Sequence, residues 1–113
     1  MHETSIIEGA MKIVLAKAEE HKISKVNTIT AKVGELSGVL PEALVFAFEF
    51  ISKGTIAEGA EFKIDAVKAS AKCRTCDLIF EIDHFNKRCP MCNEFCGNII
   101  TGHELYIDTM EGE

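Results

Sequence analysis

The chain has 113 residues, of which 47% are hydrophobic and 27% are charged, and its formal net charge is -6. This balance is typical of one globular domain with at most a small subdomain attached, and it excludes a disordered chain. The excess of acidic residues also argues against nucleic acid as the main partner, because affinity for phosphates comes from Lys and Arg.

An amphipathic helix is predicted for residues 4–22, near the start of the chain. Its apolar side chains recur at helical spacing and are Ile7, Met11, Val14 and Ala18. Ser5 followed by Glu8 is typical of a capping box, which satisfies free amide groups in the first turn of a helix. We therefore expect residues 1–3 to form a short tail in front of the helix.

Three strands and a second helix are predicted in the rest of the chain. Alternating apolar residues favour strands within residues 25–36, 60–69 and 104–110. Residues 37–54 predict a helix, because Pro41 suits the first turn and apolar side chains share one face. These apolar side chains are Leu44, Phe48 and Ile51.

Four of the five cysteines form two C-x-x-C pairs with 12 residues between them. The pairs are Cys73 with Cys76 and Cys89 with Cys92. Two such pairs supply the four thiolates of a tetrahedral zinc site, which has no open position for water and is therefore structural. Disulfides or unliganded buried thiols are the alternatives. A reducing compartment disfavours the first, and the few apolar residues between the pairs disfavour the second.

Two further residues of the cysteine-rich segment were considered as ligands. Cys96 can replace Cys92 in principle, but the C-P-x-C turn makes the better pair, so we interpret Cys96 as a thiol outside the site. His84 is interpreted as a solvated turn residue.

The cysteine-rich segment lies between the last two predicted strands, which indicates an insertion. We expect a zinc-binding domain at residues 70–98, inserted into an α/β domain made of residues 1–69 and 99–113. The predicted fold class is α+β, with two helices packed on a three-stranded sheet and an inserted zinc-ribbon-like domain. No apolar stretch approaches the roughly 20 residues that span a bilayer, and charged residues interrupt the leading segment, so we expect a cytoplasmic protein without membrane contact.

The first three residues, Met1, His2 and Glu3, suggest a second metal site. The Met1 amine, the backbone nitrogen of His2 and the His2 imidazole can close a five-membered and a six-membered chelate ring around one ion. A nitrogen-rich planar set suits Ni(II) or Cu(II), and Glu3 can complete it through its backbone nitrogen or add its carboxylate. For the tripeptide alone, an ordinary solvated histidine remains the favoured alternative.

The complete pattern closely resembles the HypA/HybF family over nearly the whole chain. It combines a Met-His-Glu start, a helix, the stretches "GELSGVLPEAL" and "GTIAEGAE", paired C-x-x-C motifs and a short final strand, in this order. The resemblance implies a nickel metallochaperone for the maturation of [NiFe] hydrogenase, and in some organisms of urease. Such a protein is not an enzyme.

The resemblance also assigns metal ligands to this sequence. It implies that His2 binds nickel with the Met1 amine and Glu3, and that nickel is a transient cargo. It implies structural zinc at Cys73, Cys76, Cys89 and Cys92. Some members carry an acidic residue just before the second helix, but here Leu40 stands near that place and Glu42 is displaced.

The partners implied by the resemblance are a nickel-handling maturation GTPase and the immature large subunit of [NiFe] hydrogenase, with urease maturation proteins as further candidates. Both a monomer and a homodimer fit the sequence. The alternative function is a zinc-ribbon module for protein interaction without nickel transfer. A zinc enzyme ranks last, because the predicted zinc site is closed and no nucleophile, histidine and acid grouping stands out.

Overall fold

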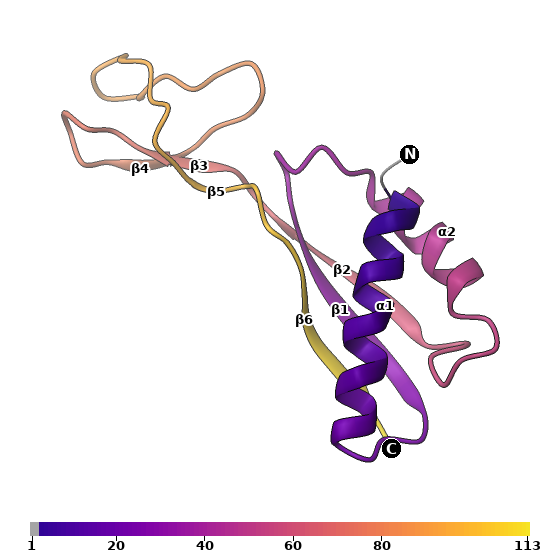
Figure 1. The fold of residues 1–113 in the computed structure, drawn as a ribbon. Coiled ribbons are helices and arrows are strands. Elements are labelled where there is room, and N and C mark those ends of the chain that lie inside the picture. Colours follow the sequence, from indigo (N-terminus) through magenta and orange to yellow (C-terminus); the bar gives the residue numbers. More distant parts are fainter. Residues whose placement is uncertain (1–2) are drawn as a thin grey trace. The chain divides into compact units, whose positions relative to one another are not determined.

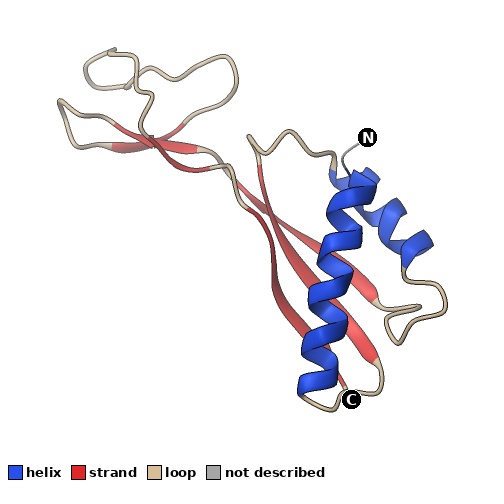
Figure 2. Cartoon of the chain, viewed as in Figure 1, coloured by secondary structure: helices blue, strands red, loops and turns tan. Residues whose placement is uncertain are grey.

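The computed structural model describes residues 3–113, and these contain two helices and six strands (Figure 1). The helices are α1 (Glu3–Glu20) and α2 (Pro41–Ile51). The strands are β1 (Val26–Gly34), β2 (Glu61–Val67), β3 (Ser70–Lys72), β4 (Ile79–Glu81), β5 (Ile99–Thr101) and β6 (Leu105–Gly112). They form two three-stranded sheets with the orders β2-β1-β6 and β4-β3-β5 (Figure 2). The predicted α+β class is confirmed.

The chain divides into two compact units. The first unit takes in the chain up to Lys32, Val39–Asp65 and Tyr106–Glu113. The second unit takes in Val33–Gly38 and Ala66–Leu105. The second unit contains residues 70–98, the range of the predicted insert, together with Val33–Gly38 and the residues on either side of the insert.

The first unit is held by the apolar face of α1. All four members of the predicted stripe are buried, namely Ile7, Met11, Val14 and Ala18. They share the core with Val26 and Ile29 of β1 and with Leu44 of α2. Phe48 of α2 stacks on Phe62 of β2, with 4.8 Å between the ring centroids. The helical period read from the sequence therefore identifies the buried face of α1 correctly.

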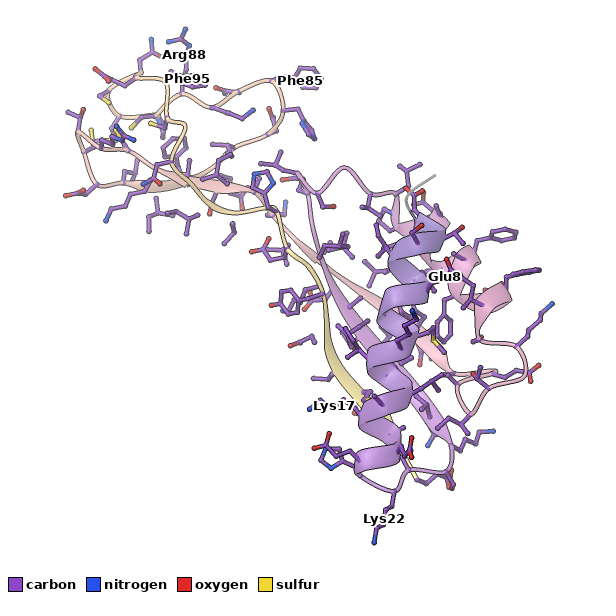
Figure 3. All side chains as sticks on the ribbon, viewed as in Figure 1. Glu8, Lys17, Lys22, Phe85, Arg88 and Phe95 are labelled. Atoms are coloured by element: carbon purple, nitrogen blue, oxygen red, sulfur yellow. The ribbon has the colours of Figure 1, made fainter. Side chains whose placement is uncertain are left out.

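The ends of α1 differ from the prediction. The helix already includes Glu3, so Ser5 and Glu8 lie inside it, and Glu8 is an exposed residue of its outer surface rather than part of a capping box (Figure 3). Glu3 likewise belongs to the first turn and not to a tail. At the other end Lys22 has a φ of 58°, and the Ile23 N–H donates to the Ala18 carbonyl at 2.8 Å. This left-handed residue terminates the helix.

The sheet of the first unit places the C-terminal strand against β1. Lys25 and Glu113 exchange both backbone hydrogen bonds, at 3.2 and 2.9 Å, which is the pattern of antiparallel neighbours. Between β1 and β2, the Lys32 ammonium donates to the Asp65 carboxylate at 2.6 Å. This carboxylate raises the pKa of Lys32 above its ordinary value. Neither helix within residues 3–113 is long and apolar enough to cross a bilayer.

The second unit contains the short sheet β4-β3-β5. Its buried core cluster is small and consists of Ala69, Ala71, Cys73, Ile82, Cys89 and Cys96. On the sheet, Ala71 pairs with Phe80 of β4 and with Ile99 of β5. Three of the six buried residues are cysteines, so the stability of this unit depends on what the thiols bind.

The Gly34–Leu36 segment joins this unit through contacts distant in sequence. The Gly34 N–H donates to the Glu104 carbonyl at 2.6 Å, and the Leu36 N–H donates to the Gly102 carbonyl at 2.7 Å. The Glu35 carboxylate accepts a hydrogen bond from the Ala69 N–H at 2.9 Å. Residues 34–36, the "GEL" of the sequence, therefore form hydrogen bonds with residues at both ends of the inserted segment.

Replacing Glu35 by alanine is expected to destabilise the second unit by about 1–2 kcal/mol, because the Ala69 N–H loses a charged acceptor. Glu35→Gln keeps an oxygen acceptor and is expected to lose less. Urea unfolding of the zinc-loaded protein measures both, with exposed Glu81→Ala of β4 as the matched control. Equal stability of the alanine variant and the control contradicts a stabilising role for the hydrogen bond between Glu35 and Ala69.

Candidate metal centre

Two turns of closely similar geometry carry the paired cysteines. In the first, the Cys73 N–H donates to the Leu78 carbonyl at 2.9 Å, and the Asp77 N–H donates to the Cys73 carbonyl at 2.9 Å. The second turn has the same two backbone hydrogen bonds around Cys89. There the Cys89 N–H reaches the Glu94 carbonyl at 2.9 Å, and the Asn93 N–H reaches the Cys89 carbonyl at 2.8 Å.

Each turn depends on the residue that follows its cysteine pair. Asp77 has a φ of 57° and Asn93 a φ of 62°, so both lie in the left-handed region. Asp and Asn tolerate this region better than other residues with a side chain. Sequence reasoning overlooked these two residues, although an Asp or Asn directly after C-x-x-C was a usable signal for this turn.

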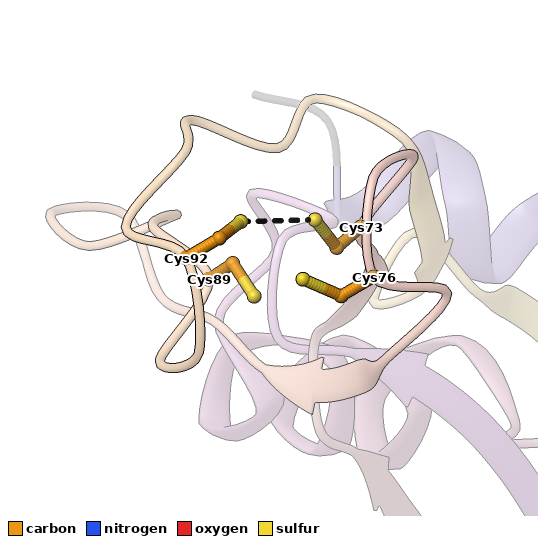
Figure 4. A group of neighbouring side chains, drawn as sticks. All are labelled: Cys73, Cys76, Cys89 and Cys92. Atoms are coloured by element: carbon orange, nitrogen blue, oxygen red, sulfur yellow. Dashed lines mark hydrogen bonds between the residues drawn. The ribbon is translucent and has the colours of Figure 1, made fainter.

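The two turns bring four thiols together (Figure 4). The sulfur atoms of Cys73, Cys76, Cys89 and Cys92 all lie within 4.8 Å of one another. The shortest contact described is 3.5 Å, between the sulfurs of Cys73 and Cys92. Tetrahedral zinc with Zn–S bonds of about 2.3 Å requires sulfur atoms about 3.8 Å apart. The donor set and its spacing therefore fit a zinc ion.

The four thiols differ in exposure. Cys73 and Cys89 are buried, Cys92 is half-buried and Cys76 is exposed. The Met91 N–H donates to the Cys89 sulfur at 3.4 Å, which helps to fix the position of this sulfur. One cysteine of each pair is thus fixed in the core of the second unit.

The surroundings shift the thiol pKa values of Cys73 and Cys76 in opposite directions. The backbone N–H of Cys76 lowers the pKa of the Cys73 thiol to about 6. The hydrogen bond between Cys76 and Cys92 raises the pKa of the Cys76 thiol to about 12. Full ligation therefore has to displace a proton from Cys76, so metal affinity falls as the pH is lowered.

The remaining candidates of the cysteine-rich segment lie outside this group. Cys96 is buried, and its thiol donates to the Glu94 carbonyl at 3.4 Å. His84 is exposed in the loop before Cys89. Within residues 3–113 the four cysteines are the one group of three or more histidine, cysteine and acidic side chains placed to hold an ion.

The predicted nickel ligands lie at the other end of the sequence. Met1 and His2 are outside the described residues, so the chelate around His2 stays a prediction. Glu3 is half-buried in the first turn of α1. Leu40, which stands near the position of the acidic residue found in some relatives, is the N-cap residue of α2 and is exposed.

Comparisons with known proteins identify the family of this chain. A family model described as "Hydrogenase/urease nickel incorporation, metallochaperone, hypA" matches residues 1–112. The "Hydrogenase maturation factor HypA" of Caldanaerobacter subterraneus is 37% identical over 115 residues and is covered completely, as is this chain. The protein of the same name from Geobacter sulfurreducens is 37% identical over 113 residues, again with complete coverage of both chains.

Two solved structures share the fold. The solution structure of the Ni metallochaperone HypA from Helicobacter pylori matches with a TM-score of 0.67 and 21% identity, covering 97% of this chain and 96% of that one. A second solution structure of a HypA protein matches with a TM-score of 0.73 and 22% identity, covering 100% and 97% of the two chains. At 21–22% identity the similarity to these two structures supports the fold alone. The family model and the two relatives at 37% identity show the family of the chain. The chain therefore belongs to the HypA family of hydrogenase and urease nickel-incorporation metallochaperones.

Proposed function

We propose that this chain is a nickel metallochaperone that delivers Ni(II) to the large-subunit precursor of [NiFe] hydrogenase, together with a partner GTPase. The observation that carries the proposal is the family match over residues 1–112, which includes the N-terminal Met-His-Glu and both cysteine pairs. Nickel is the cargo of this activity. The protein is accordingly a binding and transfer factor, for which we propose no catalytic step.

The four cysteines of the second unit would hold a structural zinc ion. Their sulfurs lie within 4.8 Å of one another, and four thiolates fill a tetrahedral coordination sphere without leaving room for water. Bound zinc supplies a cross-link between the two turns. Cys73 and Cys89 anchor that cross-link in the core, while Cys76 and Cys92 complete the donor set nearer the surface.

Nickel would bind to His2, with the Met1 amine and Glu3 as further ligands. Supporting this, Glu3 is in the first turn of α1, where backbone N–H groups have no partner within the helix. Its backbone nitrogen is therefore free of helical bonding and can complete a planar nitrogen set of the kind that Ni(II) prefers. A site made of few side chains at a chain end also allows a receiving protein to add ligands one at a time.

Nickel titration tests the proposal most directly. We expect calorimetry on protein with its native N-terminus to show about one nickel per chain. His2→Ala, and a version extended by one residue before Met1, should each weaken binding by a factor on the order of 100 or more, because each removes a nitrogen ligand or its chelate ring. Zinc content should stay unchanged in both.

The matched control is His21→Ala, which removes a different histidine, exposed just after α1. It is expected to bind nickel as the unchanged protein does. Equal nickel binding in all versions contradicts the N-terminal site. Hydrogenase activity in cells that depend on this chain then reports delivery, and His2→Ala is expected to lose it unless excess nickel is supplied.

The proposal also covers the partners of the protein and its location in the cell. The partners are a nickel-handling maturation GTPase and the immature hydrogenase large subunit, with urease maturation proteins as a further class, and the site of action is the cytoplasm. Copurification with tagged versions of the GTPase and of the large subunit tests each partner separately. Sedimentation with and without nickel distinguishes a monomer from a homodimer.

One observation favours the second candidate, a zinc-ribbon module for protein interaction without nickel transfer. Phe85 and Phe95 of the second unit are 98% and 69% exposed, and Met91 is 76% exposed (Figure 3). Exposed apolar side chains of this size are typical of contact surfaces. A protein that binds its partners normally but takes up no nickel at its N-terminus would support this alternative over the first.

A further inference from the structure

The fifth cysteine is not one of the four grouped thiols, but it packs in the same buried cluster as two of them. Cys96 is 5% exposed and belongs to the same buried cluster as Cys73 and Cys89, with Cys92 packed against that cluster. Cys76 is exposed and takes no part in it. Three of the four candidate ligands therefore share the buried side of the site with Cys96.

The backbone holds Cys96 in this place. The Cys96 N–H donates to the Lys87 carbonyl at 2.8 Å, and Arg88 pairs with Phe95 in an antiparallel bridge. The next rung is the bond between the Cys89 N–H and the Glu94 carbonyl, at 2.9 Å. Cys96 is thus held on a strand-like segment that pairs with the residues just before Cys89.

A polar cavity gives the Cys96 side chain room beside the site. Its volume is about 350 Å³. It is lined by both Cys73 and Cys96, together with Lys72, Arg74 and Glu94–Asn98. The Cys96 thiol donates to the Glu94 carbonyl at 3.4 Å, and an S–H group is only a weak donor. Rotating the Cys96 side chain therefore breaks only weak interactions of its thiol.

The geometry points to Cys96 as a reserve zinc ligand that takes the place of Cys76. In a tetrahedral site, three ligands form the face opposite the fourth. Cys73, Cys89 and Cys92 lie in or against the buried cluster that contains Cys96, and the exposed Cys76 does not, so Cys96 is the thiol beside the three ligands that remain when Cys76 leaves. This inference rests on the zinc site of the proposed function.

The exchange needs no oxidant or reductant. A zinc–sulfur bond to Cys96 forms and the bond to Cys76 breaks, while the proton of the Cys96 thiol passes, directly or through water, to the Cys76 thiolate. The number of thiolates on zinc stays four. The second unit thereby keeps its cross-link while Cys76, the exposed member of the set, is free to react or to bind elsewhere.

Cobalt substitution tests the exchange, because the sulfur-to-cobalt charge-transfer band grows with the number of thiolate ligands. The variants are Cys76→Ser, Cys96→Val and the double variant, all made in the full chain. We expect Cys76→Ser to keep the band intensity of the unchanged protein. The double variant should fall to about three quarters of it and should lose zinc to a chelator at least about tenfold faster than Cys76→Ser.

Cys96→Val alone is the matched control, since a buried free cysteine behaves as a small apolar side chain and valine preserves that character. It should retain four-thiolate intensity, which shows that valine is tolerated at this position. If Cys76→Ser already has three-quarters intensity, or loses zinc as fast as the double variant, Cys96 is a packing residue and the inference is wrong. If the unchanged protein binds no cobalt or zinc at the cysteines, the zinc site itself is wrong, a distinct outcome.

Discussion

A variant with serine in place of both Cys73 and Cys89 is expected to bind no zinc and to lose the fold of the second unit. Both sulfurs are buried, and the other buried residues of this core are two alanines, Ile82 and Cys96. So small an apolar core offers little stability of its own, whereas structural zinc contributes about 10–16 kcal/mol to folding in small zinc domains. This is comparable to the whole stability of a typical domain, about 5–15 kcal/mol. At most three thiols remain in the variant, so Cys96 cannot restore four.

Zinc content per chain and amide hydrogen exchange measure this result. Protection should disappear within Ala66–Leu105 and persist in α1 and α2, because the first unit has its own core. Removing zinc from the unchanged protein with a chelator should have the same effect. Thr75→Ser, in the exposed part of the first turn, is the control and should change neither zinc content nor protection. A variant without zinc that still protects Ala66–Leu105 contradicts the assignment.

Features of the fold that depend on nearby residues were accessible from the sequence. The buried stripe of α1 follows from residues spaced three and four apart, and all of its members are buried as expected. The cysteine pairs are equally local, since each turn is closed by backbone bonds that span four or five residues. Their spacing therefore predicts which four sulfurs meet.

Features that depend on distant contacts could not be foreseen in the same way. Glu35 reaches the Ala69 N–H across 34 positions, and neither residue has a local pattern that indicates a partner. The capping box is a local pattern that failed as well: Ser5 and Glu8 have the right spacing, but α1 already includes Glu3 and leaves both residues inside the helix. The N-terminal chelate stays a prediction, because Met1 and His2 lie outside the described residues and only nickel binding can test it.

Gly34→Ala is expected to destabilise the protein by at least about 3–4 kcal/mol, a large effect for the addition of one methyl group. A Cβ atom at this position would lie 2.1 Å from the Gly102 carbonyl oxygen and 2.7 Å from the Glu104 nitrogen. Both are backbone atoms, so no side chain can rotate away. The strands would have to separate, and the bonds that the Gly34 and Leu36 N–H groups make, at 2.6 and 2.7 Å, would lengthen or break.

The same substitution at Gly9 provides a matched control with the opposite sign. A Cβ there meets nothing within 4 Å, and Gly9 lies inside α1, so alanine should stabilise the protein by up to about 1 kcal/mol through helix propensity. Urea unfolding of the zinc-loaded protein measures both variants. If the unfolding free energy of Gly34→Ala is within about 1 kcal/mol of that of the unchanged protein, the close approach of Gly34 to the backbone of Gly102 and Glu104 is wrong. If the expected loss is found, the glycine of the "GEL" letters is required by the backbone that closes the second unit, independently of any role in metal binding.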